Sequence, residues 1–183
     1  MRYIKTKRLN LRSWKPEDVI PFIKATQDRD VNQFTPTVMT IKEAREFARL
    51  SSASVNDRGF GLFAVERRDT KEFIGIAGIR VKQFDDKKHA HEMHTMFPCI
   101  ELYVMLIKKH WNQGFATEAL RGVVKFTEKK TDIHSVYAFV SNRNMPGLNV
   151  LDKLGMQKID TFKHQQYVDG HSKQAFFIYK LDT

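Results

Sequence analysis

The segment from Ile100 to Ala119 contains the residues best suited to chemistry. An apolar stretch typical of a buried strand runs into a short loop with Gly114, and the loop leads directly into an amphipathic helix. Such a junction points the unpaired amides of the first helical turn at one spot, where the helix dipole adds about half a positive charge. Gly114 lets the backbone approach a ligand closely, and Ala116 is small. The spacing predicts a phosphate site, although a plain turn before a helix would also use this glycine.

The elements that must position this segment follow from the periodicity of the apolar residues. Strands are expected over 9–12, 60–66, 73–81, 97–107, 136–140, 156–162 and 173–181. Helices are expected after Pro16, after the capping box Thr40 to Glu43, over 116–127, and over 144–154 before Gly155. This order of strand, helix, helix, three strands, helix, strand, helix and two strands predicts an α+β, or mixed α/β, fold.

Composition narrows the class of protein. The chain has 183 residues, of which 42% are hydrophobic, and no linker divides it, so we expect one domain over residues 1–183. Its only cysteine, Cys99, excludes an internal disulfide framework and favours a reducing, cytoplasmic compartment. No apolar run is long enough to serve as a signal peptide or to cross a membrane. The net charge of +10 suggests a nucleic acid, an acidic protein surface or a phosphorylated cofactor.

Three motifs together resemble one enzyme family. Residues 111–116, WNQGFA, resemble the R/Q-x-x-G-x-G/A motif with which GNAT N-acetyltransferases bind acetyl-CoA. Residues 111–119, 6–12 (TKRLNLR) and 144–156 (NMPGLNVLDKLGM) are similar to motifs of the Rim-type branch, which acetylates the N-termini of ribosomal proteins. The resemblance implies the GNAT fold, a mostly antiparallel twisted sheet that helices flank and whose fourth strand is splayed.

The resemblance also implies which residues hold acetyl-CoA as a co-substrate. A bulge would splay the strand over 101–107 and expose its backbone to the pantetheine arm. These contacts would come from Val104, Met105 and Leu106, and the pyrophosphate would bind the amides of Asn112, Gln113, Gly114, Phe115, Ala116 and Thr117. Asn144 matches an asparagine that bonds near the cofactor arm, and it is equally suited to capping a helix.

Glu101 is the candidate general base, because it aligns with the glutamate of this branch's E-I-G-Y pattern. Burying a carboxylate among apolar residues is costly and raises its pKa towards the range useful for a base. The alternatives are a strand edge in water or a structural ion pair. The general acid is unassigned, because Leu151 stands where many GNAT enzymes have a tyrosine, and Gly147 stands where this branch often has a serine.

Two other features invite chemistry and are discounted. His89, His91 and His94 lie close together, but their segment is polar and has no fourth ligand nearby, so we expect no metal and instead expect this loop near the acceptor. Cys99 precedes the strand with Glu101, and we expect a small buried thiol there because acetyl transfer in this family is direct.

The function expected is transfer of an acetyl group from acetyl-CoA to a primary amine, by direct attack in a ternary complex. A protein or peptide α-amino group is the favoured acceptor. The alternatives are a small amine, such as a polyamine or an antibiotic, and a basic RNA- or ribosome-binding module with a degenerate cofactor site. The charge of +10 is a poor match for a polyamine.

Partners beyond the acceptor follow from the charge distribution. Lys108, Lys109, Arg143 and Lys153 lie in sequence near the expected phosphate contacts. Residues 1–16 contain six cations and no acids, which leaves a basic surface for an acidic or ribosomal partner. We expect a monomer or a homodimer that does not engage a membrane.

Overall fold

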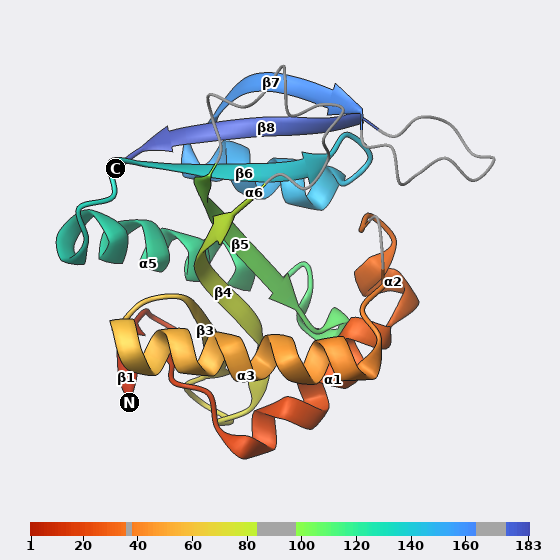
Figure 1. The fold of residues 1–183 in the computed structure, drawn as a ribbon, viewed down its shortest axis with the longest axis vertical. Helices are drawn as coiled ribbons and strands as arrows, with labels where there is room; N and C mark the ends of the chain where they lie inside the picture. Colours follow the sequence, from red (N-terminus) through yellow and green to blue (C-terminus); the bar gives the residue numbers. More distant parts are fainter. Residues whose placement is uncertain (36–37, 84–97, 164–174) are drawn as a thin grey trace.

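The computed structural model describes residues 1–35, 38–83, 98–163 and 175–183, which form one sheet with helices on both faces (Figure 1). The described strands follow the order β1-β2-β3-β4-β5-β6-β8-β7. They are β1 (Arg2–Lys5), β2 (Leu9–Arg12), β3 (Leu62–Arg67), β4 (Phe73–Lys82), β5 (Cys99–Leu106), β6 (Ser135–Ser141), β7 (Gln157–Lys163) and β8 (Ala175–Asp182). Only β5 and β6 pair in parallel among these strands, so the predicted mixed, mostly antiparallel fold is confirmed.

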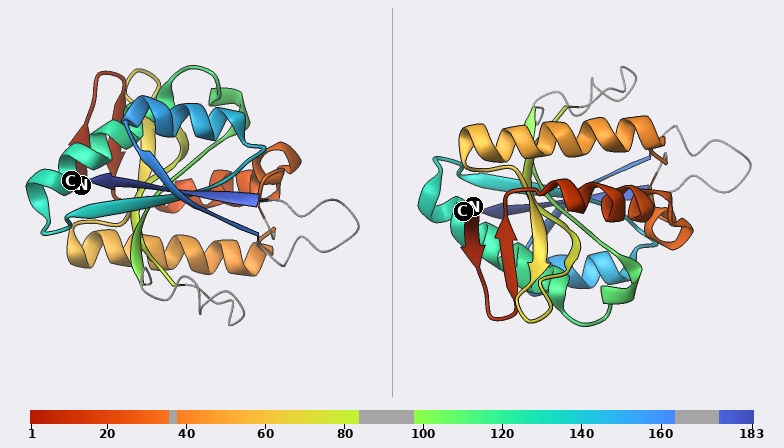
Figure 2. Two further views of the ribbon diagram at one scale, coloured as in Figure 1. Left: turned by 90° about the horizontal axis from the view of Figure 1, so that it is seen from above. Right: turned by 90° about the horizontal axis from the view of Figure 1, so that it is seen from below.

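Helices cover the two faces of the sheet unequally. The described helices are α1 (Val19–Gln27), α2 (Arg29–Asn32), α3 (Ile41–Arg58), α5 (Phe115–Lys130) and α6 (Met145–Leu154), with short 3-10 turns η1 (Pro16–Asp18) and η2 (Lys108–His110). Seen along the sheet, α3 lies on one side, and α5 and α6 lie on the other (Figure 2). Within the described ranges, every helix is too short or too polar to cross a lipid bilayer.

Two hydrophobic cores hold these layers together. One includes Leu102 and Leu106 of β5 with Phe115 and Leu120 of α5, on the face that α5 covers. The other includes Phe22 and Ala48 and lies between the sheet and the helices α1 and α3. Because side chains alternate along a strand, β5 sends Leu102 and Leu106 to the first core and its odd-numbered residues to the opposite face.

Local signals explain most helix ends. The capping box is confirmed, because the hydroxyl of Thr40 accepts from the N–H of Glu43 at 3.2 Å and the Glu43 carboxylate accepts from the N–H of Thr40 at 2.7 Å. Gly155 ends α6 with a φ of 77°, the left-handed conformation expected. Strand β1 and helix α2 were not predicted, and each has only four residues.

The sheet opens between β5 and β6. Their register contains a single pair, Glu101 with Tyr137, after which the two strands diverge. Counted from β2, β5 is the fourth strand, so the splayed fourth strand is present. The bulge expected in it is absent from the described ladder, because β4 and β5 pair without a shift from Gly75–Leu106 to Lys82–Cys99. The divergence therefore lies on the β6 side of β5.

Candidate active site

A cleft of about 1420 Å³ occupies the opening between β5 and β6. It is larger than the roughly 300–1,000 Å³ of an ordinary small-molecule pocket. All the residues predicted for the site except Gln113 line it, namely Glu101, Val104, Met105, Leu106, Asn112, Gly114, Phe115, Ala116, Thr117 and Asn144. The cleft also borders the region of α2 through Asn32 and Phe34, so it has one end at α5 and another at α1 and α2.

The loop before α5 has the geometry of an anion site. Asn112 and Gly114 both have left-handed backbones, with φ of 58° and 77°. The first helical bond runs from the N–H of Glu118 to the carbonyl of Gly114 at 3.1 Å. Among the described residues, no acceptor bonds the six consecutive backbone amides from Asn112 to Thr117. A concave run of free amides at a helix start fits a pyrophosphate.

Strand β5 turns part of its backbone into the opening. The N–H of Ile107 donates to the carbonyl of Ile74 at 2.9 Å, so odd-numbered residues of β5 bond β4. The backbones of Val104 and Leu106 therefore face β6, whereas that of Met105 faces β4. The indole of Trp111 donates to the carbonyl of Leu106 at 2.8 Å, which leaves Val104 with both its backbone groups available to an extended ligand arm.

Arg8 binds the outer side of the loop before α5, residues 112–117, which we call the phosphate loop after the ligand that the sequence predicts for it. Its Nη1 donates to the carbonyl of Gln113 at 2.9 Å, and its guanidinium carbon lies 4.4 Å from the centre of the Phe115 ring. Its Nε donates to Oε2 of Glu118 at 2.6 Å, and the hydroxyl of Thr6 donates to Oε1 at 2.6 Å. Burial raises the pKa of Glu118, but these hydrogen bonds outweigh burial and lower the pKa below its ordinary value. The N-terminal motif and the phosphate-loop motif thus form one hydrogen-bonded unit.

Asn144 both lines the cleft and caps α6. Its Oδ1 accepts from the N–H of Gly147 at 2.9 Å, which confirms the N-cap. A Cβ on Gly147 would lie 2.7 Å from Nδ2 of Asn144. The glycine therefore accommodates the capping amide at the position where the resemblance led to the expectation of a serine.

Glu101 lies in an ion pair at the base of the opening. Its side chain points to the face of β5 opposite Leu102, and the residue is 4% exposed. Oε2 of Glu101 accepts from Nε of Arg80 at 2.6 Å, across the ladder between β4 and β5. Burial lowers the pKa of Arg80, but its charge interaction and hydrogen bond with Glu101 outweigh burial and raise it, so the guanidinium stays charged. This pair is the structural alternative that the sequence left open.

Tyr103 and Cys99 complete the surroundings of Glu101. The guanidinium carbon of Arg80 lies 4.2 Å from the centre of the Tyr103 ring, and both residues line the cleft. Burial raises the pKa of Tyr103. Cys99 is a buried free thiol, as expected, and burial raises its pKa to about 11. Such a thiol is a poor nucleophile at neutral pH.

His110 forms part of the wall beneath the phosphate loop. It is 4% exposed, and among the described residues neither ring nitrogen has a hydrogen-bond partner. Its Nε2 lies 3.6 Å from a carboxylate oxygen of Glu72. Burial lowers the pKa of His110, so the ring is neutral at physiological pH and its protonation opposes folding.

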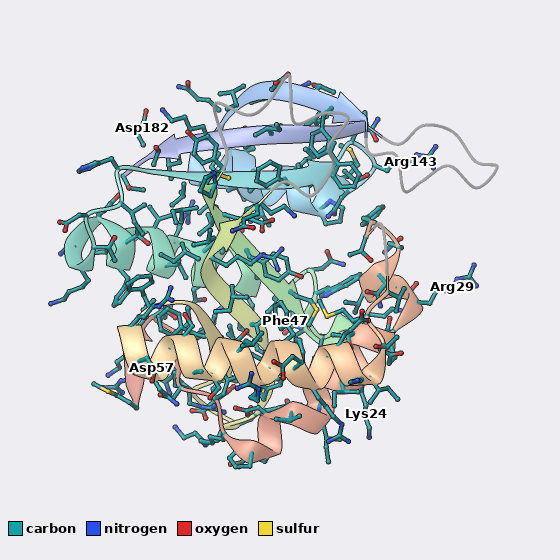
Figure 3. All side chains as sticks on the ribbon, viewed as in Figure 1. Lys24, Arg29, Phe47, Asp57, Arg143 and Asp182 are labelled. Atoms are coloured by element: carbon teal, nitrogen blue, oxygen red, sulfur yellow. The ribbon has the colours of Figure 1, made fainter. Side chains whose placement is uncertain are left out.

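The cations near the phosphate motif in sequence are placed differently in space. Lys108 bonds Asp30, and Lys109 bonds Glu72. Lys153 lines the cleft. Arg143 extends away from the body of the molecule (Figure 3). The carboxylate pairs of the first two lysines make Lys153 the cation of this group best placed to meet a cofactor phosphate.

Sequence reasoning missed Arg8, Arg80 and Tyr103 as site residues. The signal for Arg80 was a lone cation in an otherwise apolar strand, but its meaning depends on the strand register. The histidines His89, His91 and His94 lie outside the described residues. Within the described ranges, no group of three or more His, Cys, Asp or Glu side chains is placed to hold a metal ion.

Comparison with known proteins supports an enzyme built on this cleft. The family described as acetyltransferase (GNAT) domain matches residues 8–157. The chain belongs to the GNAT acetyltransferase family. This GNAT protein is 25% identical over 169 residues to the uncharacterized N-acetyltransferase YoaA of Bacillus subtilis (strain 168). The aligned residues cover 91% of this chain and 89% of YoaA. It is accordingly an acyltransferase of the N-acetyltransferase type, and enzymes of this fold use acetyl-CoA.

Solved structures with different acceptors share the fold of this GNAT enzyme. RimL, a ribosomal L7/L12 α-N-protein acetyltransferase in complex with coenzyme A, superposes with a TM-score of 0.74 at 13% identity, covering 100% of this chain and 98% of RimL. Spermidine N-acetyltransferase from Vibrio cholerae, in complex with CoA and spermine, gives a TM-score of 0.71 at 15% identity, covering 95% of each chain. Fold similarity therefore does not select the acceptor.

Proposed function

We propose that this enzyme transfers the acetyl group of acetyl-CoA to the α-amino group of a peptide or protein. The observation that carries the proposal is the cleft itself, which has a concave run of free amides at one end and the Glu101 carboxylate beside the opening of the sheet. The first feature suits a pyrophosphate, and the second suits an amine that must lose a proton.

The chain's own residues would divide the work as follows. Bound acetyl-CoA supplies the acetyl group as a thioester. The amides from Asn112 to Thr117 bind the pyrophosphate, and Val104 bonds the pantetheine arm in the opening between β5 and β6. Glu101 attracts the acceptor's ammonium group and accepts one proton from it, directly or through water, so that the amine attacks with a free electron pair. As the tetrahedral intermediate collapses, the nitrogen loses its second proton to solvent, the C–S bond breaks, and the departing thiolate takes a proton from solvent.

An α-amino group suits this arrangement better than a lysine side chain. A free α-amino group has a pKa near 8 and a lysine near 10.4, so a lysine costs about 3 kcal/mol more to deprotonate at a given pH. The hydrogen bond from Arg80 occupies one oxygen of the Glu101 carboxylate, which makes Glu101 a modest base. Such a base is sufficient for the more acidic of the two amines.

The motif resemblance to the Rim-type branch supports a protein N-terminus as the acceptor, the kind of acceptor that the full name of RimL states. The shared fold of spermidine N-acetyltransferase supports the rival acceptor, a polyamine. The buried free thiol of Cys99 supports a reducing compartment such as the cytoplasm as the place of the reaction.

A two-part experiment tests the proposal. Acetyl-CoA at 100 times its dissociation constant should stabilise the enzyme by about 2.7 kcal/mol, measured as a shift in thermal unfolding. Acetylation of a peptide library with free N-termini should then be compared with acetylation of the same peptides blocked at the N-terminus but containing lysine. Faster acetylation of the blocked peptides, or of spermidine, would show that the acceptor class is wrong. No thermal shift would exclude the transferase function.

A further inference from the structure

The guanidinium of Arg80 has donors that the described protein does not use. Its Nε bonds Glu101, and among the described residues no hydrogen bond involves its Nη1 or Nη2. Its side chain is 29% exposed and lines the cleft. A guanidinium carries five N–H donors, and leaving such donors without partners in a partly dry site is costly.

The direction of these free donors is fixed. Tyr103 lies against the face of the guanidinium, at 4.2 Å from its central carbon, and Glu101 holds one edge. The opposite edge is left for the cleft. A structural ion pair alone would not need this orientation, because a lysine ammonium pairs with a carboxylate without a fixed plane.

The charge of the cleft favours oxygen-bearing groups over further cations. Glu101 is the one carboxylate among its described lining residues, and Arg80 already pairs with it. Lys82, two residues along the same strand face, also lines the cleft and lies over the Phe139 ring. The part of the cleft around Glu101 therefore carries the positive charge of Lys82 in addition to the Arg80–Glu101 pair.

We propose that Arg80 is a specificity-determining residue. It binds the carbonyl oxygen of the acceptor's own aminoacyl group, next to the amine that becomes acetylated. This inference rests on the proposed function and names what Glu101 and Arg80 recognise together. Because the two side chains are 2.6 Å apart, one acceptor reaches both with its amine at Glu101 and an oxygen at Arg80 only if that nitrogen and oxygen are a few bonds apart. An α-aminoacyl group meets this condition, since three bonds separate its nitrogen from its carbonyl oxygen. A polyamine has no such oxygen, and in a lysine side chain the nearest one is seven bonds away.

The test compares an acceptor that has this oxygen with one that lacks it, at matched amine pKa. One acceptor is the dipeptide amide Ala-Gly-NH2, and the other is a fluorinated alkylamine chosen so that its amine has the same pKa. The wild-type enzyme should prefer the dipeptide amide in kcat/KM by about tenfold to a hundredfold, as expected for a hydrogen bond to a charged group. Equal use of the two acceptors would overturn the role of Arg80.

The variant Arg80→Lys keeps the charge beside Glu101 and removes the fixed donors. It should abolish the preference by raising KM for the dipeptide amide far more than KM for the alkylamine. An equal fall for both acceptors would show that Arg80 merely supports Glu101 and would contradict the proposal. The thermal shift with acetyl-CoA verifies that the variant is folded.

Two further variants isolate the effect. Tyr103→Leu keeps both charges but removes the ring that orients the guanidinium, so it should also raise KM for the dipeptide amide selectively. Arg49→Lys alters another arginine–glutamate pair, with Glu46 at 2.7 Å on the exposed side of α3, and should leave the preference unchanged. A wild-type enzyme that acetylates spermidine but neither of the two monoamines would instead refute the α-amino function itself, a result distinct from the failure of Arg80 alone.

Discussion

Arg8 and Glu118 connect the start of the chain to the first turn of α5. Nε of Arg8 donates to Oε2 of Glu118 at 2.6 Å, and the backbone N–H of Arg8 donates to Oε1 at 2.7 Å. The same guanidinium holds the carbonyl of Gln113. Glu118 thus fixes the outer side of the loop whose inner side offers free amides to the cleft.

Glu118→Gln should lower the free energy of unfolding by about 1–3 kcal/mol, because the neutral amide loses charge-assisted bonds to a partly buried partner. It should also weaken acetyl-CoA binding, since Arg8 is no longer held against the loop. Urea unfolding and equilibrium binding measure the two effects. Glu128→Gln, an exposed change on the same helix, is the control. Equal stability of the two variants would contradict the role given to Glu118.

Stability should fall in two stages as the pH is lowered. Burial lowers the pKa of His110 below its ordinary 6.5, so the unfolded chain takes up this proton first and stability declines below about pH 6.5. Hydrogen bonds lower the pKa of Glu118 and Glu66 below the ordinary 4.5, although burial opposes both shifts. Their contribution is complete above that value and is lost as the pH falls through their folded pKa values.

Urea midpoints between pH 7 and pH 3 would separate these stages. Glu118→Gln should keep the loss near pH 6.5 and reduce the loss below pH 4.5. His110→Phe should abolish the first stage, because the buried imidazole of this position is then absent from both the folded and the unfolded chain. A stability profile without a decline near pH 6.5 would contradict the burial of a neutral His110.

Glu101→Gln should reduce kcat by about a hundredfold or more, because a general base contributes roughly 10²–10⁴-fold and an amide accepts no proton at neutral pH. Acetyl-CoA affinity should change little, since the free amides and Val104 are untouched. Steady-state kinetics and calorimetric binding give both numbers. Unchanged turnover would remove Glu101 as the base and leave its pair with Arg80 as a structural contact.

Gly114→Ala and Gly155→Ala form a matched pair. Both glycines have a φ of 77°, so each alanine should cost about 1 kcal/mol or more in unfolding free energy. A Cβ on Gly155 would meet nothing within 4 Å. A Cβ on Gly114, which belongs to the phosphate loop, would lie 3.4 Å from Nη2 of Arg8. Only Gly114→Ala should therefore weaken acetyl-CoA binding. Equal affinities in the two variants would argue that the loop does not bind the pyrophosphate.

Much of the fold was predictable because its signals are local. The capping box at Thr40 and the glycine after α6 work through neighbouring residues, so the sequence displays them directly. Strand β1 escaped prediction because Arg2–Lys5 is too short to show a period and gains its place by pairing with β2 and packing on α5.

The parts of the site that depend on local backbone structure were predictable from the sequence. The parts that depend on how neighbouring strands align were not. Gly114 and the helical pattern after it predict a cluster of free amides. The pairing of Arg80 with Glu101 follows from the alignment of β4 with β5, which hydrophobic patterning alone does not determine to the residue. The contact between Arg8 and Gln113 joins residues more than a hundred positions apart, beyond the reach of any local pattern.

The single residue pair between β5 and β6 leaves an interior strand edge whose hydrogen bonds the described part of the chain does not satisfy. A ligand arm that enters this gap serves as the missing strand and binds only the folded chain, so the population of unfolded molecules falls as the ligand accumulates. We therefore expect bound acetyl-CoA to lengthen the lifetime of the enzyme in the presence of a protease.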